Sequence, residues 1–223
     1  GVVPARQLRV IENGVDVDKF AGLGKATPGR TLLSFGRWSA NKGLVETLDL
    51  LVALRQDGND WQLLLAGRDF DLRHADLQRE VAARGLQAAV EIVSAPSQEQ
   101  LAALFSRAQY FVSLSRHEGF GIAAIEAMSA GLVPILSRIP PYAKLREESG
   151  LGALVDATDL ASASDAVRAL VDVAPEQFAL RREGAMRHAA RYHWRHAVAA
   201  YLDEYRAAIA HDDAQAQADG VPR

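Results

Sequence analysis

Residues 110–128 read YFVSLSRHEGFGIAAIEAM. An apolar run opens this stretch, and a charged tripeptide then leads through a Gly-Phe-Gly turn at 119–121 into a second apolar run. A buried strand that passes through a glycine turn into an apolar helix, here expected from near Phe120, is typical of a βα unit. Glu118 precedes the turn, and Glu126 lies about two turns inside the expected helix. Because a buried carboxylate is costly unless something pairs with it, Glu126 predicts either a bound ligand or a buried ion pair with an arginine.

The same alternation of short apolar runs and longer amphipathic stretches continues along the chain. Besides the run at 110–114, apolar runs predict strands at residues 31–35, 62–66, 90–93, 132–136 and 152–155. Alternating strands and helices favour a parallel sheet, because each crossover between parallel strands places a helix on one face. We therefore predict the fold class α/β, as a Rossmann-like three-layer sandwich with about six parallel strands and C-terminal helices.

The last part of the chain is expected to be helical, from residue 159 to about His211. Its aromatic-rich segment at 192–209 predicts an anchoring stripe. The polar residues 212–223 are expected to form a disordered tail, whereas residues 1–211 are expected to form a single domain.

The composition argues against several classes of function. A net charge of −3 gives no reason to expect nucleic acid as a partner. The absence of cysteine excludes disulfides and thiolate metal sites. No acid is suitably spaced with His188, His193 and His196, so no metal site is expected. Because the sequence shows no signal-peptide pattern and no long uncharged apolar run, we predict a cytoplasmic protein without a transmembrane helix.

The loops that follow the strands hold the candidate site residues, because ligands of an open parallel sheet bind beyond the carboxyl ends of its strands. After the first expected strand, Gly36 and Arg37 precede Lys42 at the start of a helix. Two cations beside free backbone N–H groups suit a phosphate or diphosphate. The alternative is a solvated loop whose basic residues face water.

The second candidate loop contains the two glutamates. Gly119 and Gly121 permit a close approach of the backbone, which predicts a second site for an anion or an oxygen. Glu126 is suited to accept hydrogen bonds from the two hydroxyls of a ribose. Glu118 is suited to accept sugar hydroxyls, or it stabilises the helix dipole as an acid at the helix start.

A dinucleotide-binding fingerprint competes for the same residues. Gly119, Gly121 and Ala124 satisfy G-x-G-x-x-A between a strand and a helix. Arg138, after the next strand, resembles a residue that accepts an NADP phosphate. The fingerprint belongs in the first βα turn, however, and here a charged tripeptide precedes it in the fourth turn. We therefore disfavour a nicotinamide cofactor.

The spacing of Glu118 and Glu126 matches the E-x7-E motif of retaining, nucleotide-sugar-dependent glycosyltransferases of family 4, and Gly119-Phe120-Gly121 fits its interior. Further matches follow in the expected order: Ile11-Glu12-Asn13-Gly14-Val15-Asp16, Gly36-Arg37, Lys42-Gly43, Leu64-Leu65-Ala66-Gly67, Ala127-Met128, Ala130-Gly131, Pro134 and Ile139-Pro140-Pro141. The chain thus resembles this family over about residues 8–156 and in the closing aromatic helix. The resemblance implies the C-terminal, donor-binding half of a GT-B fold, in which the active site lies between two Rossmann-like domains.

The resemblance also implies roles for the charged candidates. Arg37 and Lys42, beside Gly36, would hold the donor diphosphate. Glu126 would bind the ribose hydroxyls. Glu118 would face the transferred sugar and is the one catalytic candidate.

Backbone and nucleobase contacts are implied at two further places. Gly119, Phe120 and Gly121 would supply backbone contacts to the donor. Val93 and Ser94, at the end of the third strand, would lie near the nucleobase, where this sequence lacks the family's usual glycine. Side chains and helix N-termini would neutralise the leaving diphosphate, so neither a metal nor another cofactor is expected.

The implied activity is transfer of a hexosyl group from GDP-mannose or a UDP-sugar to a saccharide or lipid-linked acceptor, in polysaccharide biosynthesis. The family's N-terminal acceptor domain is missing from these 223 residues. We therefore expect this chain to bind the donor with little transfer, as the donor half of an enzyme. The alternative is a non-catalytic nucleotide-sugar-binding module. Through the missing domain, the resemblance allows peripheral association of the full enzyme with the inner face of the membrane.

Overall fold

Six parallel strands form a single sheet in the order β3-β2-β1-β4-β5-β6. The computed structural model describes residues 8–218 except residue 57. The strands are β1 Thr31–Trp38, β2 Gln62–Asp69, β3 Val90–Ser94, β4 Tyr110–Ser113, β5 Val133–Ser137 and β6 Ala153–Val155. Each predicted strand is present, which confirms the α/β fold and its parallel sheet.

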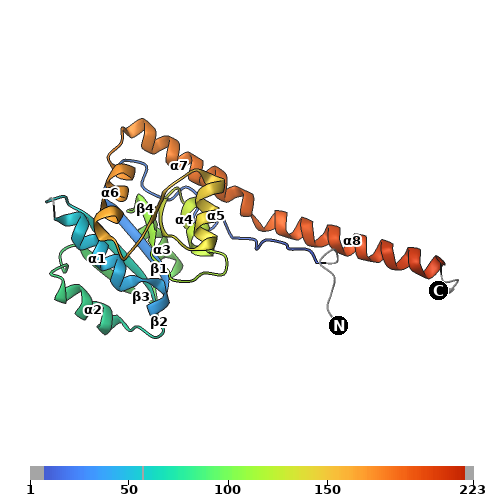
Figure 1. Ribbon diagram of the computed structural model, residues 1–223, viewed down its shortest axis with the longest axis horizontal. Coiled ribbons are helices and arrows are strands. Elements are labelled where there is room, and N and C mark those ends of the chain that lie inside the picture. The colour runs from blue at the N-terminus through green and yellow to red at the C-terminus, as the bar shows by residue number, and fades with distance from the viewer. Residues whose placement is uncertain (1–7, 57, 219–223) are drawn as a thin grey trace.

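Helices cover both faces of this sheet, as Figure 1 shows. They are α1 Leu44–Arg55, α2 His74–Ala83, α3 Gln98–Phe105, α4 Ile122–Ser129, α5 Pro140–Ser149, α6 Leu160–Val171, α7 Pro175–Ala189 and α8 Trp194–Ala218, with short 3-10 helices η2 Ala40–Lys42 and η3 Ala190–Tyr192. One apolar core lies under α1, α2 and α6 and contains Leu32, whereas the other lies under α3, α4 and α5 and contains Leu33. Neighbouring residues of a strand point to opposite faces, so β1 contributes to both cores of the three-layer sandwich.

Helix α5 is the element that the sequence does not predict. Two prolines open it, at the first positions of the helix, where the missing N–H costs no hydrogen bond. Only Tyr142 and Leu145 are buried among its residues, so its apolar periodicity is weak. The helix lies beside the carboxyl end of β4, and Tyr142 points from it into the core.

Two helix boundaries also differ from the prediction. Helix α4 begins at Ile122 rather than near Phe120, because Gly121 caps it with φ +89°. Helix α8 continues to Ala218, past the end predicted near His211, and Figure 1 shows it extending away from the sheet. Residues 219–223 of the predicted tail lie outside the described residues. No helix in the described part of the chain is long and apolar enough to cross a membrane.

Candidate functional site

The sheet changes direction between β1 and β4. From β1 the chain runs outward through β2 to β3, and then returns to place β4 on the other side of β1. Ligands of open α/β sheets bind at the carboxyl ends of the strands at such a switch point. The loop after β1 and the loop after β4 meet there. The Asn41 side-chain amide donates to the His117 carbonyl at 2.8 Å, and the Arg116 N–H donates to the Asn41 carbonyl at 2.8 Å.

Glu118 is held firmly at this junction. Its Oε1 accepts hydrogen bonds from Lys42 Nζ at 2.7 Å, from the Ser115 hydroxyl at 2.7 Å and from the Tyr142 hydroxyl at 3.2 Å. The Glu118 side chain is only 15% exposed. The acid is therefore more than a helix-start residue that stabilises a dipole. Lys42, expected to face a phosphate, bridges the two loops instead by pairing with Glu118.

Arg37 is the exposed cation of the first loop. Its guanidinium lies over the ring of Phe70, with 5.1 Å to the centroid. The Arg37 side chain forms no hydrogen bond or ion pair with any residue of 8–218 that the structure describes. A guanidinium with free donors is suited to bidentate binding of a phosphate. Arg37 thus lies at the end of β1 with its guanidinium stacked on Phe70, and its role as a phosphate ligand stays a prediction.

Arg37 also lines a cavity of about 390 Å³ beyond the carboxyl ends of β1 and β2. The cavity is lined by Lys19, Phe35, Gly36, Arg37, Ala66, Gly67, Arg68, Pro96, Ser97, Gln98 and Leu101. Three of these residues are cations, and none of their three side chains is hydrogen-bonded or ion-paired to another described residue. Such a cavity is suited to an anionic ligand with a flat polar part, as a nucleotide has.

The predicted nucleobase residues lie beside this cavity rather than in its lining. Val93 and Ser94 form the end of β3, whereas the residues that line the cavity there are Pro96, Ser97 and Gln98. The structure also adds Arg68, which the sequence analysis missed. Arg68 pairs in register with Arg37 on the neighbouring strand, so the rule that sites lie at strand ends was a signal that pointed to it.

Glu126 lies in α4 and is half-buried, and its carboxylate forms no hydrogen bond or ion pair with any described residue. The alternative of a buried ion pair with an arginine is therefore wrong for the described structure. Burial raises the pKa of the Glu126 carboxyl, the charge of Lys19 lowers it, and that of Asp16 raises it further. Lys19 lines the cationic cavity, whereas Glu126 does not. A carboxylate with both oxygens free can accept two hydroxyl hydrogen bonds.

The N-terminus of α4 offers a set of free backbone donors. Ala124 is the first residue of this turn whose N–H is bonded, to the carbonyl of Gly121 at 2.9 Å. The N–H groups of residues 119–123 have no partner within the described chain. Positive φ at Gly121 and the positive end of the helix dipole make this turn suitable for an anion.

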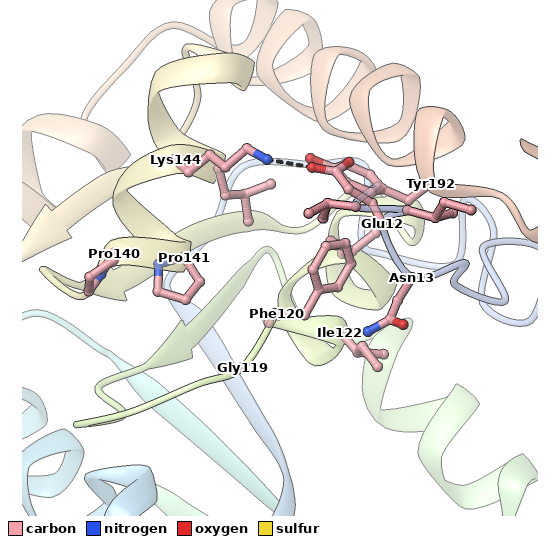
Figure 2. A pocket seen from close by; sticks show the side chains of 14 residues that line it. Glu12, Asn13, Gly119, Phe120, Ile122, Pro140, Pro141, Lys144 and Tyr192 are labelled. Carbon is pink, nitrogen blue, oxygen red and sulfur yellow. Dashed lines mark hydrogen bonds and ion pairs between the residues drawn. The ribbon is translucent and has the colours of Figure 1, made fainter. Parts of the chain in front are cut away.

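A second, larger cavity of about 770 Å³ opens beside the same turn. Figure 2 shows Phe120 and Ile122 below the segment that carries Glu12 and Asn13, with Pro140 and Pro141 to one side. An ion pair between Lys144 and Glu12 crosses the cavity (Figure 2). The space is largely apolar, and Gly119, Phe120 and Gly121 are among the residues that line it.

No three metal-binding side chains gather anywhere in the described ranges 8–56 and 58–218. His188 is buried against the ring of Tyr192, and burial lowers the pKa of its imidazole. His193 Nε2 lies 3.0 Å from Asp18. These histidines thus belong to the packing of the C-terminal helices.

The family model of glycosyl transferases group 1 matches residues 17–186. The chain is 56% identical over 208 residues to the GDP-mannose:cellobiosyl-diphosphopolyprenol alpha-mannosyltransferase of Xanthomonas campestris, covering 93% of this chain and 55% of the relative. It is 40% identical to the enzyme of that name from Komagataeibacter xylinus, covering 88% of this chain and 50% of the relative. The chain therefore spans about half the length of the curated relatives that it matches.

Solved structures share the same fold. Sucrose-phosphate synthase from Thermosynechococcus elongatus superimposes with a TM-score of 0.73 at 26% identity, over 91% of this chain and 53% of that one. The C-terminal domain of a group 1 glycosyl transferase from Francisella tularensis superimposes with a TM-score of 0.64 at 21% identity, over 79% of this chain and 97% of that domain. Together with the family match, these similarities show that the chain belongs to the group 1 glycosyl transferases and has the fold of the C-terminal domain of a GT-B enzyme.

Proposed function

We propose that this chain is the donor-binding domain of a mannosyltransferase that uses GDP-mannose and acts on a lipid-linked saccharide. The observation that carries the proposal is the junction of two loops at the switch point. There Gly36 and Arg37 line both the cationic cavity and a small pocket that also contains Lys42 and Glu118, and the free N–H groups at the start of α4 directly follow Glu118 in the chain. The names of the relatives at 56% and 40% identity support GDP-mannose over a UDP-sugar.

In this proposal, different residues around the junction bind different parts of the donor. The nucleoside occupies the cationic cavity, and Glu126 accepts the ribose hydroxyls. Arg37 and the N–H groups at the start of α4 bind the diphosphate. Lys42 keeps its ion pair with Glu118 and also donates to a phosphate oxygen, because an ammonium has three N–H donors. Glu118 then lies beside the sugar, as the residue nearest to the transferred group.

Binding without a divalent metal is part of the proposal. Arg37, Lys42 and the α4 N-terminus together supply positive charge for the diphosphate leaving group. GDP binding is therefore expected to be the same with magnesium and with EDTA, in a thermal shift or calorimetric measurement. Binding that is lost in EDTA would contradict the metal-free mechanism.

The nucleotide site is tested by measuring stabilisation of the chain by GDP, UDP and ADP. We expect GDP to stabilise it most. Arg37→Ala should remove a charge-assisted contact worth about 1.5–3 kcal/mol, which corresponds to a loss of about 10- to 150-fold in affinity. Arg187→Ala is the matched control, because Arg187 is also exposed and lies on α7, away from the cavity. If no nucleotide stabilises the chain, the donor site is wrong, and if Arg37→Ala binds GDP normally, the phosphate assignment is wrong.

Catalysis itself requires an acceptor site that the proposal places outside this chain. Curated relatives are about twice as long, and their names specify a polyprenol-linked acceptor, which is a membrane lipid. We propose that transfer occurs at a membrane surface with the help of that remaining half. Joining this chain to the other half of the Xanthomonas campestris relative should restore mannosyl transfer, and Glu118→Gln should abolish it. A joined protein that binds GDP-mannose without transfer would favour the non-catalytic module.

A further inference from the structure

The Glu118 carboxylate is held by one oxygen only. Lys42, Ser115 and Tyr142 all donate to Oε1, at 2.7, 2.7 and 3.2 Å. No side chain or N–H in the described part of the chain donates to Oε2. A carboxylate bound through both oxygens to its own protein would be a structural anchor. This carboxylate instead keeps a whole oxygen for a ligand.

Tyr142 is the partner that comes from elsewhere in the fold. It lies on α5 and is 1% exposed, whereas Ser113 and Ser115 lie at the end of β4. The Tyr142 hydroxyl is 2.8 Å from the Ser113 hydroxyl. A carboxylate only accepts, so Tyr142 donates its single proton to Glu118, and Ser113 donates to the Tyr142 oxygen. Burial and the charge of Glu118 raise the pKa of the Tyr142 hydroxyl, which keeps that proton in place at neutral pH.

This arrangement fixes the direction of the free oxygen. The terminal torsion angle χ3 of a glutamate has a broad distribution, so a carboxylate that accepts from a single donor can still rotate. Three donors on three different segments restrict that rotation. A site residue with a locked geometry binds its ligand without first losing conformational freedom.

We propose that Tyr142 and Ser115 are positioning residues, which hold Glu118 by Oε1 so that Oε2 accepts a hydrogen bond from a hydroxyl of the donor sugar. The inference rests on the proposed function and deepens it. In the proposed function, Glu118 binds the sugar of the donor, whereas Arg37 and Glu126 bind its nucleotide. Loss of the positioning hydroxyls therefore weakens recognition of the sugar and leaves recognition of the nucleotide unchanged.

The experiment compares affinities for GDP and for GDP-mannose, measured by calorimetry on this chain. Tyr142→Phe keeps the buried ring and removes only the hydroxyl. We expect its affinity for GDP to stay within about twofold of the wild type and its affinity for GDP-mannose to fall about tenfold. Tyr110→Phe is the matched control, because Tyr110 is equally buried at 1% and its hydroxyl has no partner among the described residues. This control should change neither affinity.

Ser115→Ala provides an independent second variant that removes another donor to the same oxygen. It should show the same selective loss for GDP-mannose, which keeps the test valid if Tyr142→Phe does not fold. Equal losses for both ligands would show a merely structural role and overturn the inference, as would unchanged GDP-mannose binding. Failure of the wild-type chain to bind GDP at all would instead overturn the proposed function, so the two failures are distinct.

Discussion

At the scale of single residues, the site contains two glutamates with opposite surroundings. The Glu118 carboxylate has three donors on one oxygen, whereas the Glu126 carboxylate has no hydrogen bond or ion pair with any described residue. Burying a carboxylate without a partner costs free energy of folding. If the proposed function holds, a ligand that supplies two hydroxyls offsets this cost, and the ionised Glu126 carboxylate then favours the bound protein over the empty one.

Glu126→Gln should therefore raise stability at neutral pH while weakening nucleotide binding. Burial raises the pKa of Glu126 above its ordinary value of 4.5, so the folded state binds more protons than the unfolded state just above that pH. The protonated Glu126 carboxyl therefore contributes stability to the wild type at low pH. This contribution is lost as the pH rises through the raised pKa. The variant should melt at a higher temperature than the wild type at pH 7 and at the same temperature near pH 4. Its affinity for GDP should fall about tenfold.

Glu183→Gln is the control for this pH dependence. Glu183 is exposed on α7 and forms no hydrogen bond or ion pair with another described residue. Thermal unfolding of both variants from pH 4 to pH 8 measures the difference. A melting temperature of Glu126→Gln that is lower than that of the wild type at pH 7 would show that the ionised carboxylate is stabilised by the fold.

At the scale of elements, Gly43 lets the two site loops meet. It follows Lys42 and caps α1 with φ +62°, and a Cβ at this position would lie 2.1 Å from the Leu114 carbonyl oxygen. The sequence shows the Lys42-Gly43 pair as a family match, but not why glycine is needed. The reason is contact with β4, whose neighbour in the sheet is β1 although more than 60 residues separate Gly43 from Leu114.

Gly43→Ala should be markedly more destabilising than Gly150→Ala. Gly150 caps α5 with a similar φ of +69°, but a Cβ there meets nothing within 4 Å. The Gly150 variant should lose about 1–2 kcal/mol from the left-handed conformation alone. The Gly43 variant should lose about 1–3 kcal/mol more, because the new methyl group pushes the loops apart.

Urea unfolding measures both glycine variants, and GDP binding provides a second readout. Displacement of the first loop moves Lys42, so Gly43→Ala should also bind GDP more weakly, whereas Gly150→Ala should not. Equal destabilisation by the two substitutions would show that the contact between the loops is not a constraint.

At the scale of the whole molecule, α8 contrasts with the packed sandwich. The aromatic stripe expected at 192–209 is divided: Tyr192 is buried against Phe120 and His188, whereas Trp194, Tyr201 and Tyr205 are 50%, 45% and 62% exposed. The outer part of α8 extends away from the domain (Figure 1). Its apolar side chains therefore contribute little to the stability of this fold.

Truncation after Ala200 should leave the melting temperature within about 2 °C of that of the full chain, because removal of exposed side chains changes stability by about 0.5 kcal/mol or less. Met128→Ala is the contrast in the same experiment. Met128 is 0% exposed in the core under α4, and its truncation should cost about 2–5 kcal/mol. If the melting temperature of the truncated chain falls as far as that of Met128→Ala, α8 is part of the cooperative fold.

The sequence alone was sufficient for the layers of the fold, and it predicts where the site lies. Apolar runs such as 62–66 and the helical spacing around Glu126 are local patterns, and alternation of the two predicts a parallel sheet with ligands at its carboxyl edge. Arg37, Lys42 and Glu118 line one small pocket, whereas Glu126 lies outside it, and their roles in a site stay predictions. Family membership also follows from local residues, because the matched motifs are short and ordered.

Tertiary structure alone decided which of these side chains are free and which are paired. Lys42 and Glu118 are 76 positions apart and meet because β1 and β4 are neighbours in the sheet. Tyr142 reaches Glu118 from α5, a helix with too few apolar residues to be recognised from its periodicity. Arg68 and Lys19 line one cavity with Arg37 although they lie in different segments of the chain. Periodicity reports the burial of each residue within its own element, whereas partners and cavities depend on strand order and helix docking, which no local pattern contains.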